Sequence, residues 1–430
     1  MANPPLLMRF KSTHHSVGQG LMSSGVLKIW RESEQGSVSQ IARLTTVFDC
    51  GTVTGNANER NERICAEMNW LSHSTNRIDV LYISHFDEDH VNGLPLLVPR
   101  FKPRKIVIPA VTAAERLMRI VATRNADELL QVSEETWNLV VDPISHLGNM
   151  AGDETEIIPL EPRMDAGVDS SDLRVPPGRS PDDAPMVTLP TKKNFGQGVV
   201  WSSMGEAVWI LRPWVQPPVQ LRTNVFITAL GYPDEKTFNN SLPSLLENIE
   251  VERGKIRAAY EKAVARKTDL LNFTSLCLYS GPPPSLNFEA DSKECKECGF
   301  WFAPIEGGCM TRSSRGLIRV CSRKPGWIST GDATLKPRSA LGRFTGAFKD
   351  VFGITGQVTL PHHGSRNNIR SEMIEALPEE TIWIASSGST NTYRHPSHEV
   401  LHMLASSGRQ IVLVNESPNS RVVKCLGVRI

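Results

Sequence analysis

The chain has 430 residues, of which 40% are hydrophobic, so it can bury a sizeable core in one large domain with insertions or in two or three domains. Its 47 basic and 46 acidic residues give a net charge of +1, which excludes nucleic-acid binding through overall charge and leaves only a local basic patch for that purpose. No stretch approaches the roughly 20 apolar residues that span a bilayer, and residues 1–9 lack the features of a signal peptide, so we expect a cytoplasmic protein with no membrane partner.

Strand and helix patterns alternate in the first third of the chain. Residues 6–50 predict short strands with turns, residues 56–73 a helix, residues 78–84 and 104–109 strands, and residues 112–131 another helix. This alternation is typical of an α/β layered architecture. Basic residues gather between positions 102 and 124, where either a nucleic-acid-binding patch or a solvated helix face would account for them. They are Lys102, Arg104, Lys105, Arg116, Arg119 and Arg124.

The strand predicted at residues 78–84 runs directly into a cluster of potential metal ligands. Four of them follow within six residues: His85, Asp87, Asp89 and His90. In an extended chain, positions 85, 87 and 89 share one face. Soluble proteins seldom gather imidazoles and carboxylates at a strand end unless a cation neutralises them. We therefore predict a metal site here; the alternative is a solvated acidic loop with two incidental histidines.

Three segments further along differ from the α/β pattern. Residues 160–200 are polar and rich in proline and aspartate, which predicts a long loop or a partly disordered insertion. Residues 235–268 carry apolar side chains at mostly helical spacing, which predicts a charged helical insertion. Residues 281–326 are rich in cysteine and predict a hairpin extended into a small subdomain.

The Cys-rich segment predicts a structural zinc site. Its cysteines follow the spacing C-x2-C-x10-C-x11-C, and a Cys-x-x-Cys-Gly turn places two thiolates where tetrahedral zinc can bind them. The candidate ligands are Cys295, Cys298, Cys309 and Cys321. Buried free thiols and a redox function are the alternatives. Disulfides are not expected without an export signal, and the remaining cysteines are expected in the core: Cys50, Cys65, Cys277 and Cys425.

Further motifs flank the His/Asp cluster in the sequence. They are V-G-Q-G at 17–20, V-F-D-C-G at 47–51, N-x-x-S-L at 272–276, T-G-D at 330–332, H-H-G-S at 362–365 and N-x-Y-x-H-P at 391–396. Together with H-x-D-x-D-H at 85–90, their order resembles that of metallo-β-lactamase fold hydrolases. Asp87 stands where the second histidine of the family usually stands, which resembles the H-x-D-x-D-H variant in the hydrolase domain of ComEC-type DNA-uptake proteins, here in a stand-alone form. The resemblance spans residues 17–397.

The resemblance implies a metallo-β-lactamase αββα sandwich over residues 1–430 and a two-metal site that binds Zn²⁺ or Mn²⁺. By resemblance, His85 and Asp87 would hold one ion, Asp89 and His90 the other, and Asp332 would bridge them. His362 is the first choice for a further ligand and His363 the second. Asp49 is expected to hold loops through hydrogen bonds. Asp89 and His395 are the catalytic candidates; His395 would be a donor to substrate or a general acid, or else a structural histidine.

Two positions depart from the resembled pattern. Arg212 stands where many members of the family place a histidine ligand, and a guanidinium cannot ligate a metal. His146 is a candidate replacement. Ser16 and Leu21 stand where carboxylates flank the first motif, and His14 or His15 could compensate.

The leading hypothesis is a metal-dependent phosphodiesterase, and specifically a nuclease that acts on DNA. Two divalent ions can activate water and clamp a phosphoryl group, and Arg366 and Arg394 are the candidate phosphate-binding residues at the rim. One alternative is hydrolysis of a small phosphoester or another small-molecule ester, which the near-zero net charge favours. The other is a regulatory or scaffold component of a multi-protein system, such as anti-phage defence, with the insertions binding protein partners.

Overall fold

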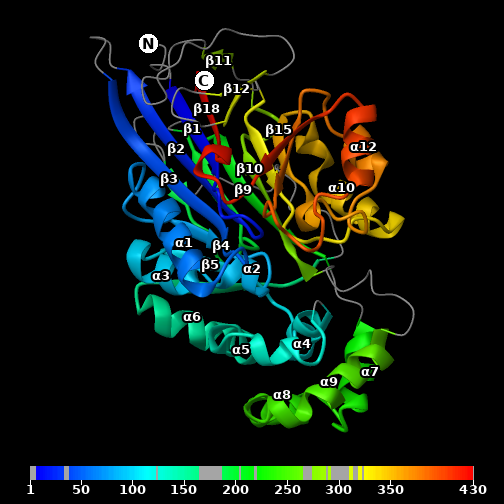
Figure 1. The fold of residues 1–430 in the computed structure, drawn as a ribbon. Coiled ribbons are helices and arrows are strands. Elements are labelled where there is room, and N and C mark those ends of the chain that lie inside the picture. The colour runs from blue at the N-terminus through cyan, green and yellow to red at the C-terminus, as the bar shows by residue number, and fades with distance from the viewer. Residues whose placement is uncertain are drawn as a thin grey trace.

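The computed structural model describes residues 6–32, 38–122, 124–163, 186–202, 205–216, 220–264, 274–286, 289–291, 309–312, 318–321 and 324–429. Within these residues, two mixed β-sheets pack face to face and helices cover their outer faces, as in an α/β sandwich (Figure 1). No helix of the described residues is long and apolar enough to cross a membrane.

The first sheet combines an antiparallel part with a parallel part. Its strand order is β12-β13-β18-β1-β2-β3-β4-β5-β6, with β11 paired to β18. Strands β18, β1, β2 and β3 are antiparallel neighbours, whereas β3 to β6 are parallel. The bounds are β1 (Leu6–His14), β2 (Met22–Glu32), β3 (Val38–Cys50), β4 (Val80–Tyr82), β5 (Lys105–Pro109), β6 (Glu156–Leu160), β11 (Glu289–Asp291), β12 (Cys309–Arg312), β13 (Ile318–Cys321) and β18 (Val422–Arg429).

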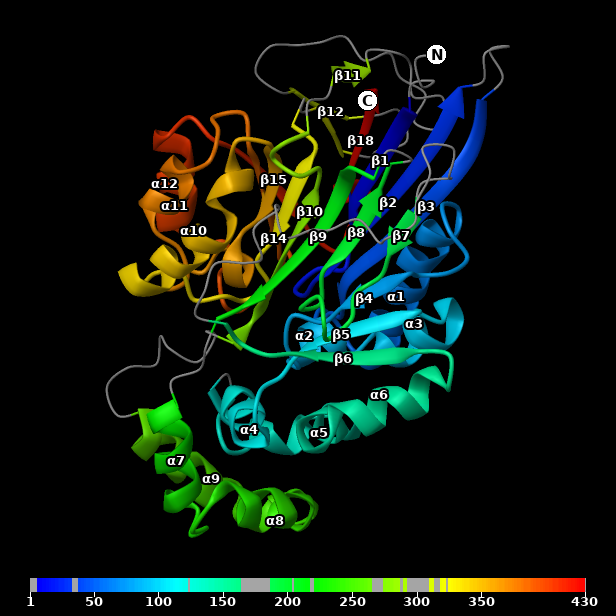
Figure 2. The ribbon, with the colours of Figure 1, turned by 180° about the vertical axis from the view of Figure 1, so that it is seen from behind.

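The second sheet has the order β17-β16-β15-β14-β10-β9-β8-β7 (Figure 2). Strands β14 to β17 are parallel and β7 to β10 antiparallel. The bounds are β7 (Met186–Thr188), β8 (Gly198–Trp201), β9 (Ala207–Val215), β10 (Leu276–Gly281), β14 (Gly326–Ser329), β15 (Thr355–Thr359), β16 (Ile382–Ser386) and β17 (Gln410–Val414). The polar segment predicted as a loop at 160–200 thus contains β7 and part of β8 among its described residues.

The core between the sheets is built from side chains that alternate along the strands. Phe10 of β1 contacts Trp209 of β9 with ring centroids 4.4 Å apart, and Trp327 of β14 belongs to the same cluster. On β9, Trp209 faces this core while the next residue, Ile210, faces the outer helices. Because successive strand residues point to opposite faces, this register decides which β9 side chains can reach the space between the sheets.

Two sets of helices cover the outer faces (Figures 1 and 2). Asn56 caps the first of them through a capping box with Glu59, and its residues Ile64, Met68 and Leu71 lie at helical spacing against the first sheet. The helices on the first sheet are α1 (Ala57–Ser72), α3 (Leu94–Phe101) and α6 (Pro143–Ala151). Those on the second are α10 (Arg338–Phe352), α11 (Ser371–Glu375) and α12 (His398–Ser406).

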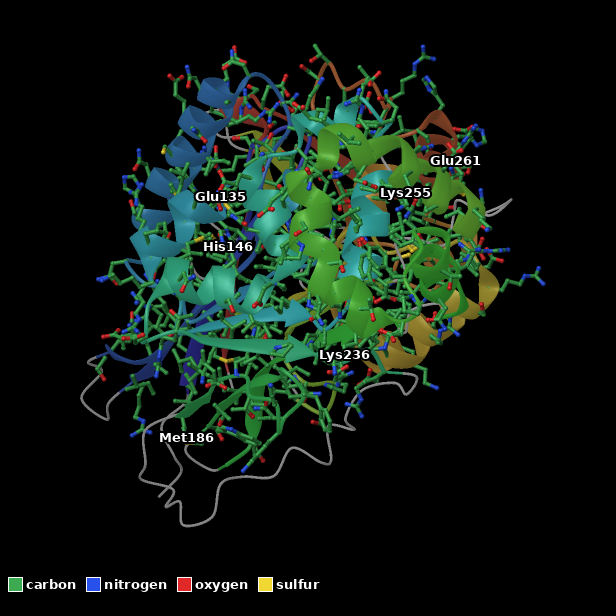
Figure 3. All side chains as sticks on the ribbon, turned by 90° about the horizontal axis from the view of Figure 1, so that it is seen from below. Glu135, His146, Met186, Lys236, Lys255 and Glu261 are labelled. Atoms are coloured by element: carbon green, nitrogen blue, oxygen red, sulfur yellow. The ribbon has the colours of Figure 1, made fainter. Side chains whose placement is uncertain are left out.

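A separate helical layer lies at one end of the molecule, where α7, α8 and α9 pack against α4 and α5 through their own apolar cluster (Figures 1 and 3). The segment predicted as a helical insertion, 235–268, is α8 and α9 as far as Val264. The helix predicted at 112–131 is shorter, because α4 ends at Ala122 and a separate 3-10 turn, η1 (Glu128–Gln131), follows. The bounds are α4 (Ala113–Ala122), α5 (Glu134–Val141), α7 (Gln220–Ala229), α8 (Glu235–Glu247) and α9 (Ile249–Val264).

Candidate metal centre

Strand ends from both sheets bring the predicted ligands together. The cluster that begins at His85 follows β4 and continues into the short helix α2 (Glu88–Val91), Asp332 follows β14, and His362 and His363 follow β15 in the turn η4 (Pro361–Gly364). Residues far apart in the sequence therefore meet at one edge of the sandwich. The side chains at this point are largely buried: Asp332 and His363 are 3% and 5% exposed.

Among the residues that the structure describes, three overlapping groups of side chains are close enough to hold a cation. In each, the ligand atoms lie within 4.8 Å of one another, and Asp332 belongs to two of the three. We call His85, Asp87 and Asp332 the Asp87 side, and Asp89, His90, His363 and Asp332 the Asp89 side. On the Asp87 side, Nε2 of His85 lies 3.4 Å from Oδ2 of both carboxylates.

The Asp89 side has similar geometry. Nε2 of His90 lies 3.3 Å from Oδ1 of Asp332, and Nε2 of His363 lies 3.1 Å from Oδ2 of Asp89 and 3.8 Å from Oδ1 of Asp332. His362 is more exposed, at 26% of its side chain, and its Nε2 is 3.7 Å from Oδ2 of Asp332. The geometry therefore ranks His363 ahead of His362, which the sequence had placed first.

Hydrogen bonds fix the orientation of two imidazoles. The carboxylate of Asp49 accepts from the Ser84 amide at 2.6 Å, from the Ser84 hydroxyl at 2.6 Å and from Nδ1 of His90 at 2.8 Å. Since the Ser84 hydroxyl donates to Asp49, it accepts from Nδ1 of His85, 2.7 Å away. Both rings thus use the Nδ1 proton on this network and turn Nε2 toward the carboxylates, as metal-binding histidines do. Asp49 has the hydrogen-bonding position predicted for it.

The histidines after β15 are oriented in the same way. Nδ1 of His363 donates to the carbonyl of Ser386 at 2.7 Å. Nδ1 of His362 lies 3.2 Å from Oδ1 of Asn368, whose amide nitrogen donates to the carbonyl of Asp332. Both histidines have positive φ, 49° and 55°, which non-glycine residues adopt rarely and mostly at functional sites. The consecutive left-handed residues turn both rings toward Asp332.

Two glycines allow the backbone to approach the cluster. A Cβ on Gly51 would lie 2.6 Å from the backbone nitrogen of His90, so the D-x-G turn packs directly on the ligand segment. Gly331 has φ of +50°, and a Cβ there would lie 2.5 Å from the hydroxyl of Ser275. That hydroxyl accepts from the amide of Asp332 at 3.1 Å. The glycines of two sequence motifs are therefore required by close packing around the centre.

The electrostatics of the centre favour cations. Burial alone would raise the pKa of Asp332, but the surrounding histidines outweigh it and hold that pKa well below the ordinary value. Burial alone would lower the pKa of His90, but attraction to the carboxylates, Asp332 first, holds it well above the ordinary value. The lowered pKa values of Asp87, Asp89 and Asp332 keep these carboxylates ionised at neutral pH, while the raised pKa values of His90 and His363 favour protonation of these two imidazoles beside them. A metal ion would replace those protons, so its binding should release them.

The donor set fits a divalent metal ion. Several buried atoms that point into the centre make no hydrogen bond to any described residue: Nε2 of His85, Nε2 of His90, Oδ1 of Asp87 and Oδ1 of Asp332. Buried polar atoms of this kind are costly unless a partner satisfies them. Imidazole and carboxylate together suit zinc, manganese or iron. These residues could therefore hold a metal ion.

An arginine that the sequence did not assign to the site enters it from α4. Arg119 is 5% exposed, and its guanidinium donates to Oδ2 of Asp87 at 3.0 Å and to Oδ2 of Asp332 at 3.3 Å. The sequence had grouped it with a basic patch on a helix surface. In the sequence, Arg119 is flanked on both sides by apolar residues, Leu117-Met118 and Ile120-Val121, which the structure buries. This apolar context is the sequence signal that could have identified Arg119 as a buried charge.

The last motif forms part of the rim. The ring of His395 lies 5.6 Å from that of His362 and stacks on exposed Tyr393 at 6.0 Å. Burial, followed by repulsion from His362 and His363, lowers the pKa of His395 to about 4. His395 is therefore neutral at pH 7 in the free protein, which favours a hydrogen-bonding role over a general acid. The peptide bond that links it to Pro396 is cis.

The predicted phosphate-binding arginines are both at the surface. Arg366 pairs with Glu399 at 2.8 Å, and the two side chains are 64% and 55% exposed. Arg394 is exposed as well. An exposed ion pair is weak and can open for a substrate, so the role of Arg366 and Arg394 stays a prediction.

The histidines considered as replacement ligands lie elsewhere. His146 of α6 pairs with Glu135 of α5 at 2.7 Å, and both residues are labelled in Figure 3. His15 bonds to Glu67 at 3.0 Å and to Ser24 at 2.8 Å, all three nearly fully buried. This arrangement has the order of a Ser-His-Glu triad, but its burial leaves no access for a substrate. His14 bonds to Ser23 at 2.9 Å in the same region.

Arg212 faces away from the centre. On β9 it follows the alternation that points Ile210 outward, and it donates to the carboxylate of Asp350 at 2.8 Å and to the carbonyl of Ala347, both on α10. Among the described residues, no histidine takes the ligand position that Arg212 occupies by resemblance. The charge of Arg212 instead pairs with the carboxylate of Asp350 on α10.

The Cys-rich segment is described only in part. Cys295 and Cys298 lie outside the described residues. Cys309 of β12 and Cys321 of β13 are at opposite positions in the backbone register of these two antiparallel strands. The zinc site stays a prediction. Cys425 of β18 is disulfide-bonded, so the expectations of a core thiol there and of no disulfides are wrong. Cys50 and Cys277 are free and buried, and Cys65 is free and half-buried.

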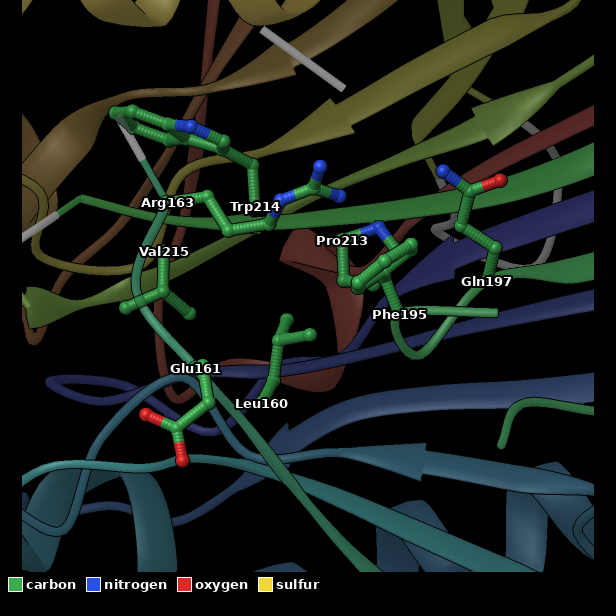
Figure 4. Close-up of a pocket in the computed structure, with 8 residues that line it drawn as sticks. All are labelled: Leu160, Glu161, Arg163, Phe195, Gln197, Pro213, Trp214 and Val215. Atoms are coloured by element: carbon green, nitrogen blue, oxygen red, sulfur yellow. The ribbon is translucent and has the colours of Figure 1, made fainter. Parts of the chain in front are cut away.

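A small hollow that is open to solvent lies near the ends of β6 and β9 (Figure 4). The guanidinium of Arg163 lies 4.0 Å from the ring centroid of Phe195 at its edge. Glu161 is the acidic residue that lines it. It lacks the converging imidazoles and carboxylates of the metal centre.

Comparison with known proteins gives no independent assignment: no family model matches the sequence, and no curated protein matches it significantly. The residues of the centre therefore carry the functional argument.

Proposed function

We propose that the protein is a metal-dependent phosphodiesterase that cleaves nucleic acid, with DNA as the first candidate, and that its sandwich is the metallo-β-lactamase αββα fold. The observation that carries the proposal is the convergence of oriented imidazoles and ionised carboxylates where strands of both sheets end. Their order along the chain, from His85 to Asp332 and the His362-His363 pair, is that of the resembled hydrolases.

The chemistry follows from what each residue can do. A bound divalent ion would polarise a phosphoryl oxygen and lower the pKa of a water molecule. Asp89, Asp332 and the histidine Nε2 atoms would hold that ion, while Asp49 and Ser84 keep the rings in the right tautomer. Neutral His395 at the rim would donate or accept a hydrogen bond at the substrate.

Hydrolysis of a small phosphoester or another small-molecule ester is the second candidate. Two observations favour it: the net charge is only +1, and the predicted rim cation Arg366 is paired with Glu399. A polynucleotide needs several phosphate contacts, which make its binding strongly salt-dependent. The two candidates therefore differ in the effect of salt on the reaction. A scaffold role would predict no hydrolysis of either substrate.

The test compares single-stranded DNA, duplex DNA and bis(p-nitrophenyl) phosphate, each with Mn²⁺ or Zn²⁺. We expect metal-dependent cleavage of DNA that His90→Ala abolishes. His402→Ala, which changes an exposed histidine of α12, is the matched control and should retain activity. Cleavage that survives both His90→Ala and a chelator would contradict the proposal. Turnover restricted to the small diester would favour the second candidate.

A further inference from the structure

The guanidinium of Arg119 occupies the Asp87 side of the centre. Its Nε and Nη2 donate to Oδ2 of Asp87 and Oδ2 of Asp332, the same two oxygens that lie 3.4 Å from Nε2 of His85. A divalent ion on this side would use those oxygens and would lie directly against the guanidinium. An arginine in a protein does not lose its proton, so the two cations would repel each other strongly in a buried site.

The position of Arg119 is fixed by its surroundings. The buried neighbours of Arg119 on α4, which include Leu117 and Ile120, pack into the apolar cluster shared with α7, α8 and α9. Beyond the end of α4, Arg124 pairs at 2.8 Å with Glu88 of the ligand segment, and Glu88 also accepts from the amide of Ser133 at 3.0 Å. The helical layer therefore holds α4 against the centre.

One nitrogen of this side chain has no partner in the described part of the chain. Nη1 of Arg119 is buried and makes no hydrogen bond to any described residue. A guanidinium donates in a planar fork that suits the oxygens of a phosphate. A buried donor without a partner beside a metal centre is suited to an anionic ligand that arrives with the substrate.

We propose that Arg119 serves as the cation of the Asp87 side, so that the centre binds a single divalent ion on the Asp89 side, and that Nη1 of Arg119 binds a phosphoryl oxygen of the substrate. The Asp89 side keeps its donors without Arg119, since Nε2 of His90 and Nε2 of His363 face Oδ1 of Asp332, the oxygen to which the arginine does not donate, and Nε2 of His363 also lies 3.1 Å from Oδ2 of Asp89. The second half of the proposal rests on the proposed function; the first half concerns metal binding alone.

The metal stoichiometry tests the first half. Mn²⁺ is the probe, because thiolate sites disfavour it and the Cys-rich segment should not contribute. We expect the wild-type protein to retain one Mn²⁺ per chain by elemental analysis, with the electron paramagnetic resonance spectrum of an isolated ion. Arg119→Met, which removes the charge at similar length, should bind two. Arg119→Lys, which keeps the charge, should stay at one.

Arg212→Met is the matched control, because Arg212 is equally buried and paired with a carboxylate but faces α10. It should bind one Mn²⁺. Two ions in the wild-type protein would overturn the proposal, and so would one ion bound with unchanged affinity in Arg119→Met. Circular dichroism verifies folding; should Arg119→Met fail to fold, the wild-type and Arg119→Lys stoichiometries still decide the question.

Inorganic phosphate tests the second half. Titrated into the Mn²⁺-loaded protein, it should bind about tenfold more weakly to Arg119→Lys than to the wild type, because charge-assisted fork bonds are lost. Equal affinities would overturn the phosphate role. A protein that shows the predicted stoichiometries but cleaves no phosphodiester would contradict the proposed function while leaving the metal-side assignment of Arg119 intact.

Discussion

Asp49→Asn should weaken metal binding without removing any ligand. Asp49 accepts two hydrogen bonds from Ser84 and one from Nδ1 of His90. An asparagine fits the backbone, because φ at this position is 56° and asparagine tolerates left-handed conformations. Its side chain, however, has one acceptor and one donor end, so it cannot accept all three bonds.

The outcome follows from which partner can adapt. The amide of Ser84 cannot lose its proton, whereas the imidazole of His90 can move its proton from Nδ1 to Nε2. The amide group of the new side chain would then donate to Nδ1, and Nε2–H of His90 would point at Asp332. Loss of such an orienting partner typically costs 10- to 100-fold in metal affinity, or about 1.4–2.8 kcal/mol.

Calorimetric titration of Mn²⁺ into protein stripped of metal measures this loss. Asp350→Asn is the control, because Asp350 also bonds to a buried side chain, that of Arg212, but on the outer face of the second sheet. Its metal affinity should equal that of the wild type. An unchanged affinity in Asp49→Asn would refute the tautomer argument.

Three other predictions concern stability, substrate binding and the zinc site. Burial would raise the pKa of Glu67, but its bonds to His15 and Arg421 outweigh this and hold that pKa well below the ordinary value. Glu67→Gln should therefore lower the free energy of unfolding by about 3–5 kcal/mol at pH 7. This loss of stability relative to the wild type should shrink as the pH falls below about 4.3, where the unfolded glutamate is protonated. A loss that urea denaturation shows to be independent of pH would contradict this. Arg366→Gln with Arg394→Gln should raise KM for DNA and flatten its salt dependence, and unchanged kinetics would exclude both from the rim. Cys298→Ser should release zinc that elemental analysis detects in the wild type, and full retention would favour free thiols.

The local part of the centre could be predicted from the sequence because it depends on short-range rules. The buried strand predicted at residues 78–84 places the cluster that begins at His85 at a sheet edge. The extended alternation expected through residue 89 ends earlier, because α2 begins at Glu88 and Asp89 therefore lies in a helix. The capped helix at residues 56–73 was equally accessible, since its N-cap and apolar spacing lie within one segment; the structure has α1 from Ala57 to Ser72. The order of later motifs then suggested which distant residues to group with the cluster.

The parts that could not be predicted depend on contacts between distant segments. Arg119 was assigned to a surface because helical spacing alone does not show that α7 to α9 bury the neighbouring face of α4. By resemblance, Arg212 stands at the position of a histidine ligand, but the alternation along β9 turns it toward α10. Cys425 is disulfide-bonded although its apolar sequence context predicted a core thiol, because a disulfide depends on a second cysteine that the local sequence does not identify.

The central claim is that the cluster at the strand ends holds a catalytic metal ion. The most direct test is the double variant Asp89→Ala with His90→Ala, assayed for bound Mn²⁺ and for metal-dependent phosphodiester cleavage, with circular dichroism to verify the fold. The account predicts a folded protein that has lost both the ion of the Asp89 side and all turnover. Unchanged metal content and unchanged turnover in this variant would contradict it.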